Sequence, residues 1–113
     1  MKQVEVESYP VSIFMATGYA RSDQIRDFCR QHCDAVGLCV TVTCTTYCYT
    51  GGLEEGVIVG LIHYPRFPAS PAAIWARAEA LAEFLCSRMH QESYTIQAPD
   101  KTVWFSHRVE DLA

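Results

Sequence analysis

The spacing of apolar residues changes from one segment of the chain to the next, and each spacing predicts a different secondary structure. From residue 38 to residue 49 the period is two, and one face of the segment carries Leu38, Val40, Val42, Cys44, Thr46 and Cys48. Such alternation, rich in β-branched and aromatic residues, is typical of a strand. The glycine-rich segment 50–56 predicts a turn, and residues 57–64 predict a strand that returns beside the first.

Two segments have helical spacing instead. Residues 22–36 predict a helix that begins at the N-cap Ser22 and ends at Gly37. Ser70 and Pro71 predict the N-cap and first residue of a second helix. Its apolar stripe, with one residue every three or four positions, consists of Ile74, Ala78, Leu81, Leu85 and Met89.

Extended segments complete the pattern at both ends of the chain. Residues 11–17, 93–98 and 101–107 predict strands, and residues 3–8 alternate as an additional strand would. The order is therefore βαββαβ, with a possible extra strand at each end. This order predicts an α+β, ferredoxin-like fold in which two helices cover one face of an antiparallel sheet. We expect residues 1–113 to form a single domain.

The middle of this predicted sheet is apolar on both faces. Residues 57–62 read VIVGLI, so both alternating sets of side chains are hydrophobic. An antiparallel sheet with one face in water normally alternates apolar with polar residues. We therefore predict a homo-oligomer, either a dimer or a trimer, that covers the second face. Gly60 would allow a partner's backbone to approach closely there.

Composition and charge narrow the class of protein. Half of the 113 residues are hydrophobic, and nine basic against thirteen acidic residues give a net charge of −4. Because the basic residues are scattered, we expect no general nucleic-acid binding. No run approaches the roughly 18 apolar residues of a membrane span, and the acidic first ten residues do not suit a signal peptide. We predict a cytoplasmic protein that does not bind membranes.

The cysteines are the most conspicuous candidates for chemistry. Cys29 and Cys33 lie one helical turn apart with His32 beside them, which makes these three residues candidate metal ligands. Cys44 and Cys48 would lie about 13 Å apart along a strand, too far to share a zinc ion or a disulfide. We predict that the cysteines are small buried hydrophobic residues, and that the protein holds no metal or other cofactor. A metal site and a redox role remain as alternatives.

The segment HYPRFP, residues 63–68, places polar side chains at a predicted strand end. His63 could act as a base and Arg66 could bind an anion, but no nucleophile or phosphate-binding glycine loop accompanies them. We interpret the segment as a proline-stiffened connection whose Tyr64 and Phe67 pack on the core. An enzyme that uses His63, Arg66 and His107 is the alternative.

Interaction residues are predicted where large side chains meet the open face or a loop. Trp104 and Phe105 are neighbours in an extended segment, so one of them should be exposed. The complete set of predicted interaction residues is Tyr47, Tyr49, His63, Tyr64, Arg66 and Trp104.

Two resemblances to known families add to these predictions. The layout from VSIFMATGYA to GLCVTVTCTTYCYTGGLEEGVIVGLI resembles the CutA-type proteins, which implies a ferredoxin-like oligomer that senses a metal ion or small molecule. The segment YTGG…EEGVIVGLIHYPRFP is similar to small phage and prophage proteins, which implies a host-directed binding protein such as an anti-CRISPR inhibitor. We therefore predict a non-enzymatic module that binds a protein partner. A CutA-like sensor is the alternative function.

Overall fold

The computed structural model describes residues 1–112 as a five-stranded antiparallel sheet and two helices. The elements in chain order are β1 (Val11–Ala16), α1 (Ser22–Val36), β2 (Thr41–Tyr49), β3 (Gly52–Leu61), α2 (Pro71–Arg88), β4 (Ser93–Gln97), β5 (Thr102–Ser106) and a final 3-10 turn, η1 (Val109–Asp111). The strand order is β2-β3-β1-β4-β5, and every neighbouring pair is antiparallel.

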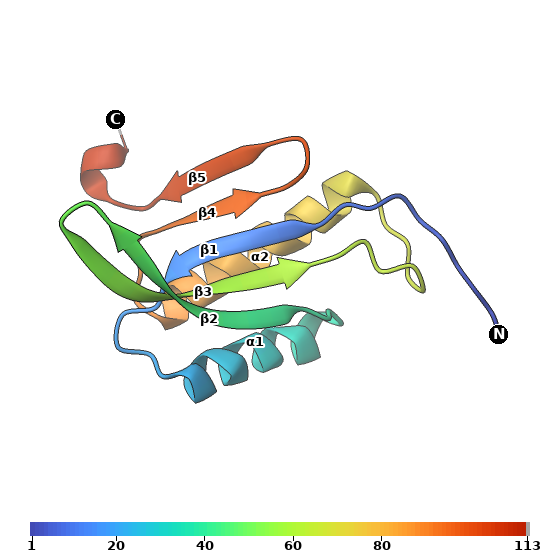
Figure 1. The fold of residues 1–113 in the computed structure, drawn as a ribbon, viewed down its shortest axis with the longest axis horizontal. Helices are drawn as coiled ribbons and strands as arrows, with labels where there is room; N and C mark the ends of the chain where they lie inside the picture. The colour runs from blue at the N-terminus through green and yellow to red at the C-terminus, as the bar shows by residue number, and fades with distance from the viewer. Residues whose placement is uncertain (113) are drawn as a thin grey trace.

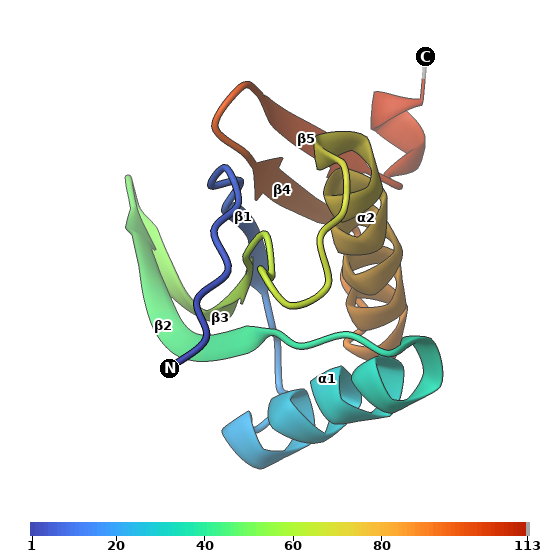
Figure 2. The same ribbon diagram turned by 90° about the vertical axis from the view of Figure 1, so that its right-hand side faces the viewer.

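Both helices pack on the same face of this sheet and leave the other face open (Figures 1 and 2). Strands β1 to β4 have the ferredoxin-like order, and β5 extends the sheet beside β4. The predicted α+β, ferredoxin-like fold is therefore confirmed, together with the extra strand at the C-terminal end.

The extra strand predicted for residues 3–8 does not form. These residues precede β1 as an extended segment that pairs with no strand among residues 1–112. The reason lies in the position of β1, because both of its neighbours stop where it begins. The last β1–β3 pair is Val11 with Leu61, and the β1–β4 pairing begins at Ser12. A continuation of β1 beyond Pro10 therefore has no ladder to join.

Helix α1 spans the predicted residues 22–36 and ends at the predicted Gly37, but its N-cap differs from the prediction. Its N-cap is Arg21 rather than Ser22, and the Gln24 side chain accepts a hydrogen bond from the Arg21 backbone N–H at 2.9 Å. Gly37 ends the helix at φ 72°, the left-handed conformation expected of it. Ile25 is buried in the core, whereas Val36 in the last turn is 56% exposed.

Helix α2 follows the prediction throughout. The Ser70 hydroxyl accepts from the Ala73 N–H at 3.1 Å, and Pro71 is the first helical residue. All five residues of the predicted stripe are buried, and the helix packs on β1 and β4. On the sheet, every second side chain packs against the helices. At its centre these side chains are Val11, Ile13, Met15, Val57, Val59 and Leu61. No helix in residues 1–112 is long and apolar enough to cross a membrane.

Candidate functional site

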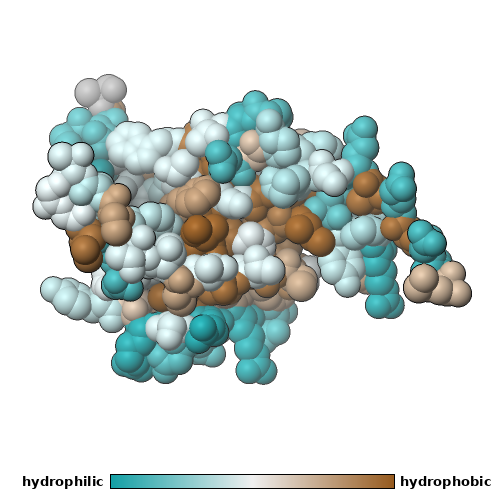
Figure 3. All heavy atoms as spheres, viewed as in Figure 1, coloured by the Kyte–Doolittle hydropathy of each residue, from teal (hydrophilic) through white to brown (hydrophobic). Residues whose placement is uncertain are grey.

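The open face of the sheet carries a row of side chains that crosses all five strands. The pairing registers place this row as Thr43, Ile58, Phe14, Thr95 and Trp104, from β2 to β5. Its apolar members are partly or largely exposed, and Trp104 is 56% exposed while its neighbour Phe105 packs against the core. Figure 3 views this face and shows hydrophobic residues along its middle. The predicted apolar second face is therefore present.

One end of this row opens into a cavity of about 230 Å³, which we call the open-face cavity. It forms where β1 and β5 end, β4 begins and the β2–β3 hairpin curls toward the C-terminal end of β5 (Figure 1). Aromatic, polar and charged side chains line it, among them Phe14, Tyr47, Glu54, Thr95, Trp104 and Arg108. The structure thus brings together two of the predicted interaction residues, Tyr47 and Trp104, from distant parts of the sequence.

Tyr47 packs against β3 in this cavity. Its ring lies over Gly56, where any side chain would overlap it, and its hydroxyl donates to the Val57 carbonyl at 2.6 Å. Burial raises the pKa of Tyr47, the nearby Glu54 carboxylate raises it further, and a hydrogen bond from the Met15 backbone works in the opposite direction. Tyr47 is therefore a neutral hydrogen-bonding wall of the cavity at neutral pH.

Two opposite charges face the same cavity. Glu54 stands across the hairpin from Tyr47, is exposed, and forms no hydrogen bond or ion pair with another side chain in residues 1–112. Arg108 follows β5, and its Nε lies 3.3 Å from a carboxylate oxygen of Glu92. The Arg108 backbone N–H donates to the Ser106 hydroxyl at 3.2 Å, which fixes the chain at this turn. The cavity can therefore receive a ligand that carries both a cation and an anion.

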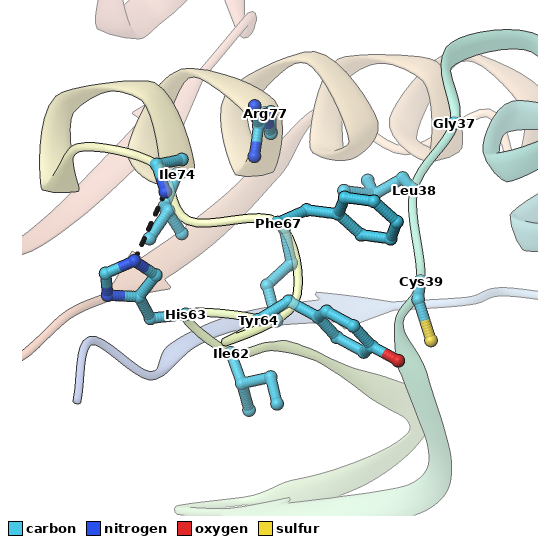
Figure 4. Close-up of a pocket in the computed structure, with 11 residues that line it drawn as sticks. Gly37, Leu38, Cys39, Ile62, His63, Tyr64, Phe67, Ile74 and Arg77 are labelled. Carbon is cyan, nitrogen blue, oxygen red and sulfur yellow. Dashed lines mark hydrogen bonds between the residues drawn. The ribbon is translucent and has the colours of Figure 1, made fainter. Parts of the chain in front are cut away.

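Three other predicted interaction residues lie at the opposite end of the sheet. His63 and Tyr64 line a second cavity of about 300 Å³ beside the start of α2 (Figure 4), and Arg66 lies next to them with its Cζ 5.3 Å from the centre of the Phe67 ring. The prediction that Tyr64 and Phe67 anchor this segment to the core is wrong. Their side chains are 42% and 66% exposed, and the two rings stack on each other at 5.9 Å.

The remaining interaction residue, Tyr49, lines neither cavity. It is exposed near the tip of the β2–β3 hairpin, where its ring lies close to Gly52. His107, named with His63 and Arg66 in the enzymatic alternative, binds the Glu83 carboxylate at 2.8 Å on the helix side of β5. The structure therefore does not bring those three residues together.

The candidate metal ligands form no metal site. Among residues 1–112, no group of three or more histidine, cysteine, aspartate or glutamate side chains could hold an ion. The His32 ring packs against Phe84 at 5.1 Å, and burial lowers the pKa of His32. Burial, followed by the neighbouring thiols of Cys33 and Cys44, raises the pKa of Cys29 to about 11. These shifts favour the neutral side chains.

The prediction that the cysteines are buried holds for only part of the set. All six are free thiols; Cys29 and Cys86 are buried and Cys33 is partly buried, but the other three are exposed, namely Cys39, Cys44 and Cys48. Cys44 and Cys48 lie on β2, an edge strand whose hairpin is not covered by a helix (Figure 2), and Cys39 lies in the linker that precedes β2.

Sequence reasoning missed Glu54 and Arg108 as members of the site. The segment TGGLEEG predicts a turn, and its two adjacent carboxylates do not indicate which of them faces the cavity. Alternation along β3 separates them: Glu54 faces the open side with Tyr47, whereas Glu55 accepts a hydrogen bond from Thr46 at 3.0 Å. Once the strand is extended back to Gly52, that alternation is a usable signal.

No protein-family model matches the chain, and no curated protein matches it either. Two solved structures do. A phage SAM lyase in its apo state aligns with a TM-score of 0.74 over 94% of this chain and 94% of that chain, at 17% sequence identity. A phage SAM lyase in complex with S-methyl-5′-thioadenosine aligns with a TM-score of 0.68 over 94% and 95% of the two chains, at 16% identity.

At this level of identity the likeness establishes a shared fold, which is that of a small phage enzyme. The prediction of a non-enzymatic binding module is therefore wrong, because the solved structures that share this fold over nearly their whole length are those of an enzyme, a phage SAM lyase. The resemblance to phage proteins is supported. Neither solved structure supports an anti-CRISPR inhibitor or a CutA-like sensor.

Proposed function

We propose that this protein is a lyase that cleaves S-adenosylmethionine and releases S-methyl-5′-thioadenosine. The observation that carries the proposal is the alignment with a phage SAM lyase over 94% of both chains. The open-face cavity adds independent support, because it combines aromatic surfaces, a carboxylate and a guanidinium. These are the groups that a nucleoside with a cationic centre and a carboxylate requires.

The cavity offers a partner to each part of S-adenosylmethionine. Trp104 and Phe14 present aromatic surfaces on which adenine can stack. Glu54 can attract the sulfonium or the ammonium group, because an unpaired carboxylate favours a nearby cation. Arg108, steadied by its ion pair with Glu92, can hold the substrate carboxylate through its remaining N–H groups.

The reaction proposed here needs no base from the protein. The substrate carboxylate attacks its own γ-carbon, a C–O bond forms, and the C–S bond breaks with its electron pair moving to sulfur. The products are neutral S-methyl-5′-thioadenosine and homoserine lactone. The reaction therefore neither consumes nor releases a proton or a water molecule. Binding that bends the amino-acid chain back on itself supplies most of what such an intramolecular step requires.

A second copy of the chain would complete the site. The open-face cavity measures about 230 Å³, smaller than the roughly 300–1,000 Å³ of typical ligand pockets. The apolar members of the row that runs into it, Ile58, Phe14 and Trp104, are partly or largely exposed, which favours burial between subunits. We therefore propose a homo-oligomer formed through the open face, as the sequence predicts.

Light scattering tests this assembly. The expected mass is at least two chains, and Ile58→Lys at the centre of the open face should reduce it to one, whereas Ala80→Lys on the outer surface of α2 should not. Gly60 is a poor test position, because an added side chain would first meet the Thr41 hydroxyl of the same chain at 2.6 Å. A wild-type protein that stays monomeric at high concentration would contradict the assembly.

The activity is tested by incubating the purified protein with S-adenosylmethionine and separating the products by chromatography and mass spectrometry. S-methyl-5′-thioadenosine and homoserine lactone should appear in equal amounts, and in water labelled with heavy oxygen the fresh lactone should carry no label. Homoserine labelled at its hydroxyl from the first time point would indicate hydrolysis instead. A folded wild-type protein that releases no S-methyl-5′-thioadenosine would exclude the proposal.

Adjacent glutamates provide a matched pair of variants. Glu54→Gln should lower kcat/KM by about tenfold or more, since it removes a full charge from the cavity. Glu55→Gln, one residue further along β3 and facing the other side, should leave kcat/KM close to the wild-type value.

The six free thiols suit a reducing compartment, so we expect the protein to act in the cytoplasm.

A further inference from the structure

The second cavity lies at the other end of the sheet from the open-face cavity, on the helix side, and we call it the end cavity (Figure 4). It is enclosed by the linker after α1, the end of β3, the loop 62–70 and the first turns of α2. Leu61 and Ile74 belong to the buried core and form its apolar floor. At about 300 Å³ it has the volume of a small ligand site, at the lower end of the range of roughly 300–1,000 Å³.

Exposed aromatic side chains form one wall of the end cavity. Tyr64 and Phe67 come from the same short turn, which is closed by a hydrogen bond from the Phe67 N–H to the Tyr64 carbonyl at 3.0 Å. Their stacked rings leave large apolar surfaces in water, and Ile62 next to them is 60% exposed. Burying this surface against an apolar ligand would be favourable at about 25 cal/mol per Å².

The only histidine in the wall, His63, contributes no charge. Its Nδ1 donates to the Glu7 carbonyl at 2.7 Å, and its Nε2 accepts from the Ala69 N–H at 3.2 Å (Figure 4). An imidazole that accepts at one nitrogen and donates at the other is neutral. The ring therefore ties the loop to the N-terminal segment and does not serve as a base or a cation.

Arg77 is the one charged side chain in the wall of the end cavity. It lies on α2, is exposed, and forms no ion pair or hydrogen bond with another residue in 1–112. No carboxylate lines this cavity. An apolar chamber with an unpaired guanidinium in its wall matches a ligand with an apolar body and a single anionic group.

We propose that the end cavity is a second binding site, separate from the open-face cavity, for a small apolar monoanion: one ring or a short alkyl chain that bears a carboxylate. The apolar body packs between Leu38 and the Tyr64–Phe67 wall, and the carboxylate pairs with Arg77. The site does not depend on the proposed lyase activity, because it shares no residue with the open-face cavity.

Phenylbutyrate and phenylbutanol form a suitable pair of probes, because they differ mainly in the anionic group. Calorimetry should show that phenylbutyrate binds about tenfold more tightly than the alcohol, as expected for one charge-assisted contact. Arg77→Gln should remove this preference and leave the binding of phenylbutanol unchanged. Arg26→Gln, an exposed arginine on α1 away from the cavity, is the matched control and should behave as wild type.

The location is tested with thiols that the protein already carries. Cys39 lines the end cavity, whereas Cys44 and Cys48 are exposed on β2 outside it. Saturating phenylbutyrate should slow the alkylation of Cys39 by maleimide, read by peptide mass spectrometry, and leave the other two rates unchanged. Protection of all three or of none, or equal affinity for the two probes, would overturn the proposal. Leu38→Trp, which fills the chamber, should abolish binding of both probes, and retained binding would overturn it equally.

Discussion

Gly56 on β3 is the position where the open-face cavity depends most on a missing side chain. A methyl group there would overlap the Tyr47 ring and lie 2.8 Å from the Met15 carbonyl oxygen. The ring cannot move away without losing the hydrogen bond from its hydroxyl to the Val57 carbonyl at 2.6 Å. Gly56→Ala must therefore either displace Tyr47 or push β3 away from β1.

The cost of this substitution follows from its two parts. Forcing an extra methyl group into packed surroundings costs about 1–3 kcal/mol, and losing the hydrogen bond adds about 0.5–1.5 kcal/mol. We expect Gly56→Ala to lower the free energy of unfolding by about 2–4 kcal/mol. Gly52→Ala, in the same strand, meets only the exposed Tyr49 ring at 3.1 Å and should cost far less.

Urea unfolding of a double-mutant cycle separates the two causes. In a Tyr47→Ala background the ring is gone, and Gly56→Ala retains only the conflict with the Met15 carbonyl. Its cost should then fall to about 1–2 kcal/mol, so the two substitutions should be strongly non-additive. If Gly56→Ala unfolds at the wild-type midpoint, or costs the same with and without the Tyr47 ring, the packing described for this wall of the cavity is wrong.

Three further predictions concern the core and the thiols. Leu81→Ala should lower the free energy of unfolding by about 2–5 kcal/mol, because Leu81 is fully buried. Ser87→Ala, on the exposed side of α2, should change it by less than about 0.5 kcal/mol. If the two variants unfold at comparable urea concentrations, the orientation described for α2 is wrong. In native buffer, maleimide should label Cys39 and Cys48 rapidly and Cys29 only after denaturation, and equal rates would contradict their exposures. Because burial raises the pKa of Cys29 to about 11 from an ordinary 9.0, only the unfolded chain ionises this thiol in that window, so stability should fall as pH rises from 9 to 11. Cys29→Ser should make the fall shallower by up to about 1.4 kcal/mol per pH unit, and an unchanged slope would refute the shift.

The secondary structure could be predicted from the sequence because its signals are local. The α2 stripe, the Ser70 cap and the Gly37 stop each depend on residues within a few positions of one another, and all three are present as predicted. Residues 57–62, which are hydrophobic on both faces of their strand, also indicated correctly that the sheet has a second apolar face. The βαββαβ order then restricted the topology to the ferredoxin-like arrangement.

Functional class could not be predicted in the same way. The chain carries no catalytic motif with a diagnostic spacing, and the reaction proposed for it needs none, because the substrate supplies its own nucleophile. The lack of a nucleophile paired with a base in the sequence therefore favoured a non-enzymatic module. The correction came from the fold, which is shared with a phage SAM lyase over nearly the whole length of both chains.

Other features depend on contacts that are distant in sequence. Residues 3–8 have the alternation of a strand, yet both neighbours of β1 stop where β1 begins, so no ladder remains for them. Cys44 and Cys48 alternate with polar residues as buried side chains would, yet β2 is an edge strand and its hairpin leaves them in water. Whether a strand residue is buried depends on which strands pair beside it and on whether a helix covers it. The local spacing of apolar residues contains neither piece of information.

The open-face cavity shows the same division between sequence and tertiary structure. Glu54 of β3, Trp104 of β5 and Arg108 of the following turn come from segments about fifty residues apart. For Glu54 and Trp104, the sequence determined which side of its own strand each side chain would occupy, because side chains in a strand alternate. Only the strand order and the curl of the β2–β3 hairpin decided that they would face one another, because long-range pairing sets which strand ends meet.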